Sequence, residues 1–84
     1  MRVLVLENSR LYQKTLRELL QEVGCSADCV SSGEEGLELL DSNDYNLIIA
    51  GQNIFDDSGS AFIEYCRQHA DHCPILLLTS EPNE

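Results

Sequence analysis

Three short apolar runs end next to residues whose types matter for chemistry. The residues concerned are Glu7 and Asn8 after the run 3–6, Gly51 after the run 47–50, and Thr79 at the end of the run 75–79. Continuous apolar runs of this length are typical of buried parallel strands. In open α/β sheets, ligands bind just beyond the carboxyl ends of such strands. A carboxylate there can coordinate a metal ion or act as a nucleophile, whereas Gly51 can do neither.

The loop after Gly51 carries two carboxylates, Asp56 and Asp57, which offer an alternative source of chemistry. Either one could contribute to a cation site or serve as a substitute nucleophile. The plainer interpretation is a polar turn, since Asp tolerates irregular backbone conformations. Glu7 is a weak candidate for metal coordination, because a single carboxylate holds a divalent cation poorly. We interpret Glu7 as a solvated carboxylate at the rim of the site.

A second group of candidate residues is the string Cys66, His69, His72 and Cys73, whose types are those of zinc ligands. A closed zinc site needs all four side chains to converge, and no flanking glycine helps the chain to turn back. Cys66 instead continues the apolar face that begins at Phe62, and a free cysteine behaves as a small apolar residue. We therefore predict no metal and no other cofactor.

Composition limits the classes of protein to which the chain can belong. Its 84 residues make one domain at most. The net charge is −10 and the five basic residues are scattered, which argues against nucleic acid as a partner. The sequence shows no secretory leader, and no apolar run approaches the ~20 residues of a membrane span. We expect a cytoplasmic protein without membrane contact, whose four cysteines are reduced thiols.

Strands and helices must alternate along the chain to position these residues. We predict strands over 3–6, 26–30, 45–50 and 75–79, with a helical pattern in each interval between them. The first helix follows Ser9, a favoured capping residue, and ends before Gly24. Its apolar residues recur on one face, at Tyr12, Leu16, Leu19, Leu20 and Val23.

The second and third helices carry similar signals. Two overlapping capping boxes pair Ser31 with Glu34 and Ser32 with Glu35 at the start of the second helix. The apolar residues that follow are Leu37, Leu39 and Leu40 in the second helix, and Phe62, Ile63, Cys66 and Ala70 in the third. The third helix therefore lies between the loop after Gly51 and the fourth strand.

This alternation predicts an α/β fold with a parallel sheet and helices on both of its faces. The first and third strands are the most apolar, so they should be central, which gives the strand order 2-1-3-4. We therefore expect three layers and a doubly wound sheet of four strands. In this order the candidate residues Glu7 and Gly51 stand side by side at the point where the winding reverses.

The ordered set of segments resembles the receiver domain of bacterial two-component response regulators, a CheY-like family with a flavodoxin-like fold. The segments that carry the resemblance are 3–9, 33–40, 45–51 with Asn53 and Gly59 after it, and 74–81. The resemblance implies a module of phosphorelay signal transduction. It places Gly51 at the phospho-acceptor position, Glu7, Asn8 and Asn53 in the acidic pocket, and Thr79 as the switch hydroxyl.

The departures from the family pattern bear on function. Family members carry two acidic residues after the first strand, where this chain has Glu7 and Asn8, and an aspartate where it has Gly51. Phe55 replaces a proline of the loop, and the family's lysine of the fifth strand has no counterpart here. Phosphoryl transfer needs an oxygen nucleophile and a metal ion that neutralises charge. We therefore predict a pseudo-receiver that is not an enzyme, with Mg²⁺ binding weak or lost.

The resemblance also implies how the module acts. Residues 1–84 correspond to one receiver-like domain without the family's last strand and last two helices, which would leave the fourth strand and the sheet face beside it uncovered. Uncovered edges and apolar patches recruit partners. We expect self-association as a dimer through the fourth strand and residues 79–84, besides contacts with a sensor kinase or an output domain.

Besides a structural metal module built on the cysteine and histidine string, which metal analysis would test, three alternatives stay open at this stage. The first is a phosphotransfer receiver that uses Asp56 or Asp57 as a substitute acceptor. The second is a fragment of a longer response regulator with an output domain downstream. The third is a nucleotide-binding flavodoxin-like module, for which the segment 7–10 is a poor phosphate loop because it contains no glycine.

Overall fold

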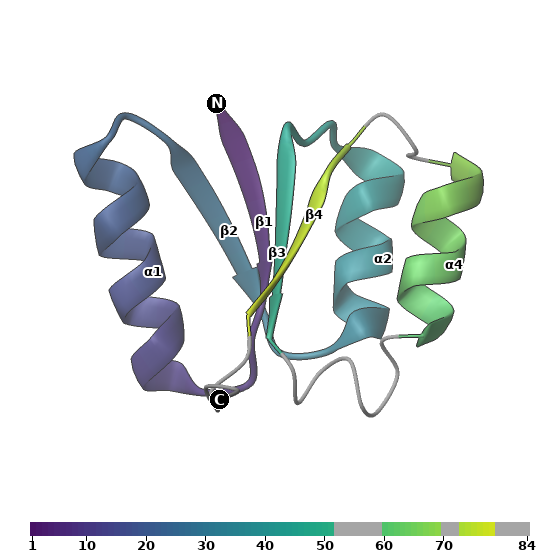
Figure 1. Cartoon of the computed structure of the whole chain (residues 1–84), viewed down its shortest axis with the longest axis horizontal. Helices are drawn as coiled ribbons and strands as arrows, with labels where there is room; N and C mark the ends of the chain where they lie inside the picture. Colours follow the sequence, from purple (N-terminus) through teal and green to yellow (C-terminus); the bar gives the residue numbers. More distant parts are fainter. Residues whose placement is uncertain (52–59, 70–72, 79–84) are drawn as a thin grey trace, which may run out of the picture.

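The computed structural model describes residues 1–51, 60–69 and 73–78. In this part of the chain, strands and helices alternate as the sequence predicts (Figure 1). The elements are β1 (Arg2–Leu6), α1 (Arg10–Glu22), β2 (Ser26–Val30), α2 (Gly33–Ser42), β3 (Leu47–Gly51), α4 (Ser60–His69) and β4 (Ile75–Leu78). None of the helices described is both long and apolar enough to cross a membrane.

The four strands form one parallel sheet in the order β2-β1-β3-β4, which confirms the predicted topology. β1 and β3 occupy the centre, and the side chains of 3–6 and 48–50 are buried. The register aligns Leu6 with Ala50. The carboxyl ends of the two central strands therefore meet at one edge of the sheet.

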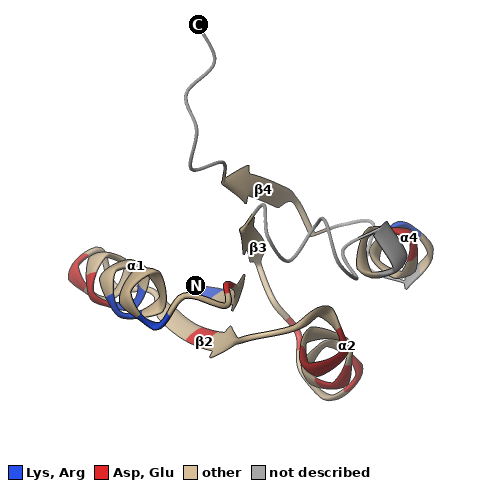
Figure 2. Ribbon diagram, turned by 90° about the horizontal axis from the view of Figure 1, so that it is seen from below, with Lys and Arg blue, Asp and Glu red and all other residues tan. Residues whose placement is uncertain are grey.

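The helices form the outer two of the three layers. Figure 2 shows α1 on one face of the sheet and both α2 and α4 on the other. Alternate residues of β1 serve the two faces: Val3 and Val5 pack with Ile49 on the α1 side, whereas Leu4 and Leu6 pack on the α2 and α4 side. The doubly wound, three-layer arrangement predicted from the sequence is thereby confirmed.

The start and end of α1 follow the predicted local signals. The Ser9 hydroxyl accepts a hydrogen bond from the Tyr12 amide at 3.3 Å, as expected for the capping residue. At the other end, Gly24 adopts a φ of +85°, a left-handed conformation that glycine adopts without the steric cost of a Cβ. α1 is thus bounded as its sequence indicates.

The predicted apolar face of α1 is only partly buried. Leu16 and Leu20, one turn apart, pack against the sheet. Tyr12, Leu19 and Val23 remain 50%, 55% and 73% exposed. The apolar face predicted for α1 is therefore buried only at its centre, because Leu19 lies on the flank of the helix and Tyr12 and Val23 lie at its ends.

α2 packs closely on the opposite face. Ser32, not Ser31, caps the helix: its hydroxyl accepts from the Glu35 amide at 3.2 Å, and the Glu35 carboxylate accepts from the Ser31 amide at 2.9 Å. Gly36 allows a close approach, since a Cβ at this position would lie 3.0 Å from Cε1 of Phe62 in α4. Of the two predicted capping boxes, the Ser32–Glu35 pair therefore forms its hydroxyl half, while the Glu35 carboxylate binds the amide one residue before the cap.

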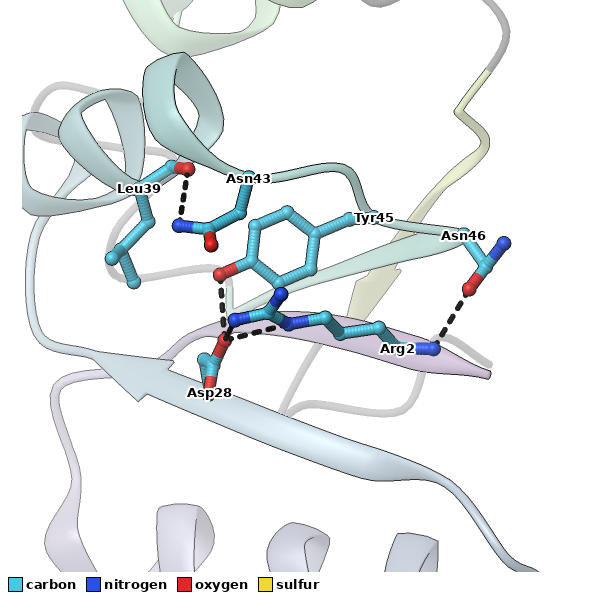
Figure 3. Close-up of polar contacts among 6 residues, drawn as sticks. All are labelled: Arg2, Asp28, Leu39, Asn43, Tyr45 and Asn46. Atoms are coloured by element: carbon cyan, nitrogen blue, oxygen red, sulfur yellow. Dashed lines mark hydrogen bonds and ion pairs between the residues drawn. The ribbon is translucent and has the colours of Figure 1, made fainter.

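The third strand begins later than predicted, at Leu47 instead of Tyr45. Tyr45 is buried in a polar cluster near the starts of β1 and β3 (Figure 3). Its hydroxyl donates to the Asp28 carboxylate at 2.7 Å, and the Arg2 guanidinium pairs with the same carboxylate at 3.1 Å while lying 5.2 Å from the centre of the Tyr45 ring. The side-chain oxygen of Asn46 completes the cluster by accepting a hydrogen bond from the backbone amide of Arg2 at 2.7 Å.

The surroundings of Tyr45 change its acidity. Burial, and then the hydrogen bond to the Asp28 carboxylate, raise the pKa of Tyr45 to about 12. Asn43, just before this segment, donates to the Leu39 carbonyl at 3.0 Å and so holds the end of α2 (Figure 3). The cluster therefore links β1, β2 and the residues just before β3, at the end of the sheet that is remote from Glu7.

Candidate functional site

The candidate site lies where the carboxyl ends of β1, β3 and β4 meet. The register pairs Leu6 with Ala50 and Gly51 with Leu78, so the residues after Leu6 adjoin Gly51. Gly51 is the last residue of β3 and not, as the sequence suggested, the first residue of the following turn. The strand runs one residue further because Gly51 still pairs with β4.

Glu7 is the best-defined polar residue of the site, and it differs from its prediction. We expected a solvated rim carboxylate, but Glu7 is only 6% exposed. Its amide donates to the Val30 carbonyl at 3.0 Å, and Oε2 accepts from the Ser9 amide at 3.0 Å. Gln13 of α1 donates to the Glu7 carbonyl. Glu7 is therefore held by the chain on both sides of it, which solvation at a rim would not produce.

Gly51 is buried directly against this carboxylate. A Cβ atom built on Gly51 would overlap Oε1 of Glu7 and lie 3.1 Å from its Cδ. It would also lie 3.5 Å from the Leu6 carbonyl oxygen, which is an ordinary contact. The Glu7 carboxylate therefore lies in the space that a side chain at position 51 would need.

The other predicted site residues are not all described. Asn8 is exposed, so it stands outside the buried pair of Glu7 and Gly51. Asn53 and Thr79, the predicted pocket carbonyl and switch hydroxyl, lie outside the described residues, as do Asp56 and Asp57. The structure therefore brings together Glu7 and Gly51 from the predicted set.

These residues do not make a site that suits Mg²⁺. The cation prefers carboxylate and phosphate oxygens, and Glu7 is the single buried charged residue in the described part of the chain. One of its oxygens already accepts the Ser9 amide. Within residues 1–51, 60–69 and 73–78, no three His, Cys, Asp or Glu side chains gather as a metal site would need.

The cysteine and histidine string is explained in part by the core. Cys66 and Cys73 are buried in the cluster between the sheet and the helices α2 and α4, as predicted for Cys66. Burial, and then the neighbouring Cys73, raise the pKa of the Cys66 thiol to about 11. The side chains of His69 and His72 lie outside the described part. All four cysteines of the chain are free.

Two residues near the site were not recognised as part of it from the sequence. Ser9 was predicted to cap α1, but its amide also binds the Glu7 carboxylate. Gln13 reaches from α1 to the Glu7 carbonyl and, at 3.4 Å, to the Val30 carbonyl. The capping motif could have pointed to Ser9. The role of Gln13 depends on a contact between distant segments, which no local sequence pattern indicates.

Comparison with known proteins places this geometry in context. Residues 3–84 match the response regulator receiver domain family. The transcriptional regulatory protein PmrA of Pectobacterium parmentieri is 31% identical over 95% of the chain. The cell cycle transcriptional regulator CtrA of Caulobacter vibrioides is 32% identical over 94% of it. The chain covers 36% and 34% of these two relatives, about a third of their length.

Solved structures give the same answer for the fold. The chemotaxis response regulator CheY4 of Vibrio cholerae has a TM-score of 0.87 and is 25% identical, and the match covers 98% of this chain and 70% of that one. The response regulator TrrA of Thermotoga maritima, solved with Mg²⁺-BeF, has a TM-score of 0.84 and is 31% identical, with coverage of 95% and 70%. The family match, the sheet order and the site at the ends of β1 and β3 agree: this chain belongs to the response regulator receiver domain family.

Proposed function

We propose that this chain is a pseudo-receiver, which takes part in two-component signalling through protein–protein contact and is not phosphorylated. The observation that carries the proposal is Gly51 at the end of β3, where the family holds its acceptor aspartate. The backbone of Gly51 offers no nucleophilic oxygen, and phosphoryl transfer requires one in line with the donor. No enzymatic activity is therefore part of the proposal.

The requirement of phosphoryl transfer for a divalent cation also supports the proposal. A divalent cation must neutralise the charge that develops on the transferred phosphoryl group. Glu7 is the one carboxylate of the described pocket, and Asn8 contributes no charge. Among the described residues, no three His, Cys, Asp or Glu side chains gather to hold such a cation.

Incubation with acetyl phosphate and Mg²⁺ tests the proposal directly. Intact-mass spectrometry should detect no phosphoryl adduct on the natural chain, because position 51 has no acceptor oxygen. An acid-stable, base-labile adduct would overturn the proposal. Loss of such an adduct in the variant Asp56→Asn/Asp57→Asn would then identify the substitute acceptor. CheY4 of Vibrio cholerae, treated in parallel, controls for the activity of the reagent.

We propose a second copy of this chain as one protein partner, docked along β4. In the described part of the sheet, β4 pairs with β3 on one side only, and it contains four aliphatic residues and no charge. Charged side chains are the usual protection of an edge strand against pairing. Leu76 and Leu77 point to opposite faces and are 51% and 43% exposed. Pairing of two β4 strands would bury both.

Light scattering with size-exclusion chromatography tests this self-association. The natural chain should elute as a dimer at high micromolar concentration, and Leu76→Glu should shift it to monomer because a charge at the new interface stays unpaired. Leu11→Glu is the matched control, since Leu11 is an exposed leucine of α1. This helix packs against β2, at the edge of the sheet opposite β4. A natural chain that remains monomeric contradicts the proposal.

Further partners follow from the relatives. PmrA and CtrA are transcriptional regulators about three times the length of this chain. We propose that a sensor kinase or an output domain of such a regulator contacts this module. We place this contact in the cytoplasm, where a transcriptional regulator reaches DNA. The acidic receiver itself is a poor DNA ligand, because its net charge of −10 repels phosphate. Any contact with DNA would therefore belong to the output domain.

A further inference from the structure

Two sulfur-bearing side chains meet at the end of the sheet that is remote from Glu7. The Cys25 thiol donates to the Met1 thioether, with the two sulfur atoms 3.8 Å apart. Met1 directly precedes β1 and Cys25 directly precedes β2. In Figure 1 the N-terminus and the connection from α1 to β2 lie at the same end of the sheet. The parallel pairing of β1 with β2 therefore brings together two sulfurs that are far apart in the sequence.

The backbones that carry these two side chains are both fixed by main-chain hydrogen bonds. The amide of Ser26 donates to the Met1 carbonyl at 3.0 Å, which continues the pairing of β1 with β2. The amide of Cys25 donates to the Leu20 carbonyl at 2.9 Å, at the end of α1. A ligand site is more precise when it stands on ordered backbone. The two sulfurs therefore start from defined positions on either side of their contact.

The contact is open to solvent, unlike the surroundings of the other thiols. Met1 is 67% exposed and Cys25 is partly buried. Cys66 and Cys73 lie in the core, and the Cys29 thiol donates to a carbonyl of α1 at 3.9 Å. Within the described residues, Cys25 is therefore the cysteine that combines access from solvent with a second sulfur.

A thiol and a thioether in contact define the kind of ion that they can hold. Thiolate and thioether sulfurs are soft ligands, which select Cu(I) among the biological metals. Mg²⁺ prefers hard oxygen ligands, and structural Zn²⁺ takes four ligands, so neither ion suits a pair of sulfurs. A metal–thiolate bond is about 2.3 Å long, so two sulfurs that share one ion lie at most ~4.6 Å apart. The observed 3.8 Å lies within this limit.

We propose that Met1 and Cys25 form a binding site for one Cu(I) ion. The Cys25 thiol loses its proton to solvent as its sulfur bonds the metal, the Met1 thioether donates a lone pair, and copper stays in the +1 state, so the step needs no oxidant or reductant. The net charge of −10 favours the approach of a cation. The ion links the start of β1 to the connection between α1 and β2, at the end of the sheet opposite Glu7 and Gly51.

Competition with a coloured Cu(I) chelator tests the site on the reduced 84-residue chain. Under anaerobic conditions with ascorbate, the chain should withdraw one equivalent of Cu(I) from bicinchoninate, measured as the loss of absorbance of the coloured complex. Cys25→Ser should abolish this uptake, because a hydroxyl is not a soft ligand. X-ray absorption at the copper edge should show sulfur neighbours in the complex with the natural chain.

The thioether can be tested by itself because Met1 is the one methionine of the chain. Expression in medium that contains norleucine replaces its sulfur by a methylene group and changes no other residue. The apparent affinity for Cu(I) should fall by at least about tenfold, since the loss of even an outer-shell partner commonly costs that much. This protein keeps all four cysteines, so it tests the site even if Cys25→Ser fails to fold.

Cys29→Ser is the matched control. Cys29 packs on the same face of the sheet as Cys25, but its thiol contacts a carbonyl and not a thioether. Removal of the Cys29 thiol should therefore leave the uptake and the affinity unchanged. An equal loss in Cys29→Ser and Cys25→Ser would assign the binding to thiols in general and overturn the proposal.

Three further results overturn the proposal. They are no withdrawal of Cu(I) from bicinchoninate by the natural chain, full uptake by Cys25→Ser, and an equal affinity of the norleucine protein and the natural chain. None of these results depends on phosphorylation or on Mg²⁺. A phosphoryl adduct on the natural chain would remove the proposed function and leave the copper site standing, so the two failures are distinguishable.

Discussion

At the scale of single residues, a glycine at the proposed acceptor position affects more than the nucleophile. The Glu7 side chain lies against the bare backbone of Gly51 and turns away from water. A carboxylate that is buried without a cation needs hydrogen bonds to compensate for lost hydration, and the Ser9 amide supplies one. The chemistry of the pocket thus depends on the residues at both of these positions.

Restoring two carboxylates should restore a cation site. In Asn8→Asp/Gly51→Asp, two aspartates join Glu7 and give the pocket the oxygen ligands that Mg²⁺ prefers. We expect isothermal titration calorimetry to detect Mg²⁺ binding by this variant and not by the natural chain. Asn8→Asp alone is the control, because it adds a charge but leaves position 51 bare. Equal heats for the double variant and the natural chain would contradict the prediction.

The raised pKa of Tyr45 predicts that the protein loses stability in alkali. Its pKa is raised from 10.0 to about 12 in the folded protein, so folding favours the neutral phenol. The stabilisation is complete below pH 10 and is lost as the pH rises through about 12. The urea midpoint of the natural chain should therefore fall across this interval relative to Tyr45→Phe, which lacks the titrating hydroxyl.

The comparison with Tyr45→Phe also separates Tyr45 from the thiols. Burial also raises the pKa of the thiols of Cys29, Cys66 and Cys73. These cysteines are common to both proteins, so their contribution cancels in the difference of the two midpoints. Parallel pH profiles of the two proteins would show that Tyr45 does not contribute.

At the scale of elements, the ends of the helices place the site. Ser9 caps α1, and its amide donates to the Glu7 carboxylate. Ser32 caps α2, which packs through Gly36 against Phe62 of α4. Local signals of this kind act before any tertiary contact, since each cap bonds within its own turn.

Removing the cap of α2 should destabilise the fold measurably. Ser32→Ala deletes the hydroxyl that accepts the Glu35 amide and should cost about 1 kcal/mol of unfolding free energy. Urea denaturation followed by circular dichroism measures the change. Ser42→Ala, at the exposed last residue of the same helix, is the matched control and should have little effect. Equal costs for the two variants would show that the cap is not important here.

At the scale of the whole molecule, charge and apolar surface oppose each other. The chain carries a net charge of −10, which disfavours the approach of a second copy. The edge strand β4 presents aliphatic side chains that favour it. The salt concentration decides whether charge repulsion or apolar attraction dominates. The repulsion between exposed charges decays over ~10 Å at 0.1 M salt and over ~3 Å at 1 M.

Self-association should therefore strengthen with ionic strength. Sedimentation velocity at a fixed protein concentration should show a larger dimer fraction in 1 M NaCl than in 0.1 M NaCl, because screening removes repulsion and leaves the apolar contact. Leu76→Glu should stay monomeric at both salt concentrations. A dimer that dissociates as salt is added would instead indicate an interface held by ion pairs, and would contradict docking along β4.

The sequence alone determined the alternation of strands and helices and the central place of β1 and β3, and it carries the proposal that Gly51 stands at the acceptor position. Each of these follows from local pattern, since strand burial and helix caps depend on neighbours in the chain. The structure alone showed that Glu7 is buried and occupies the side-chain space of Gly51, and that Leu19 of α1 stays exposed. Those features arise from the register of β1 against β3 and from the placement of a helix on a sheet, which bring together residues far apart in the sequence and leave no periodic signal in it.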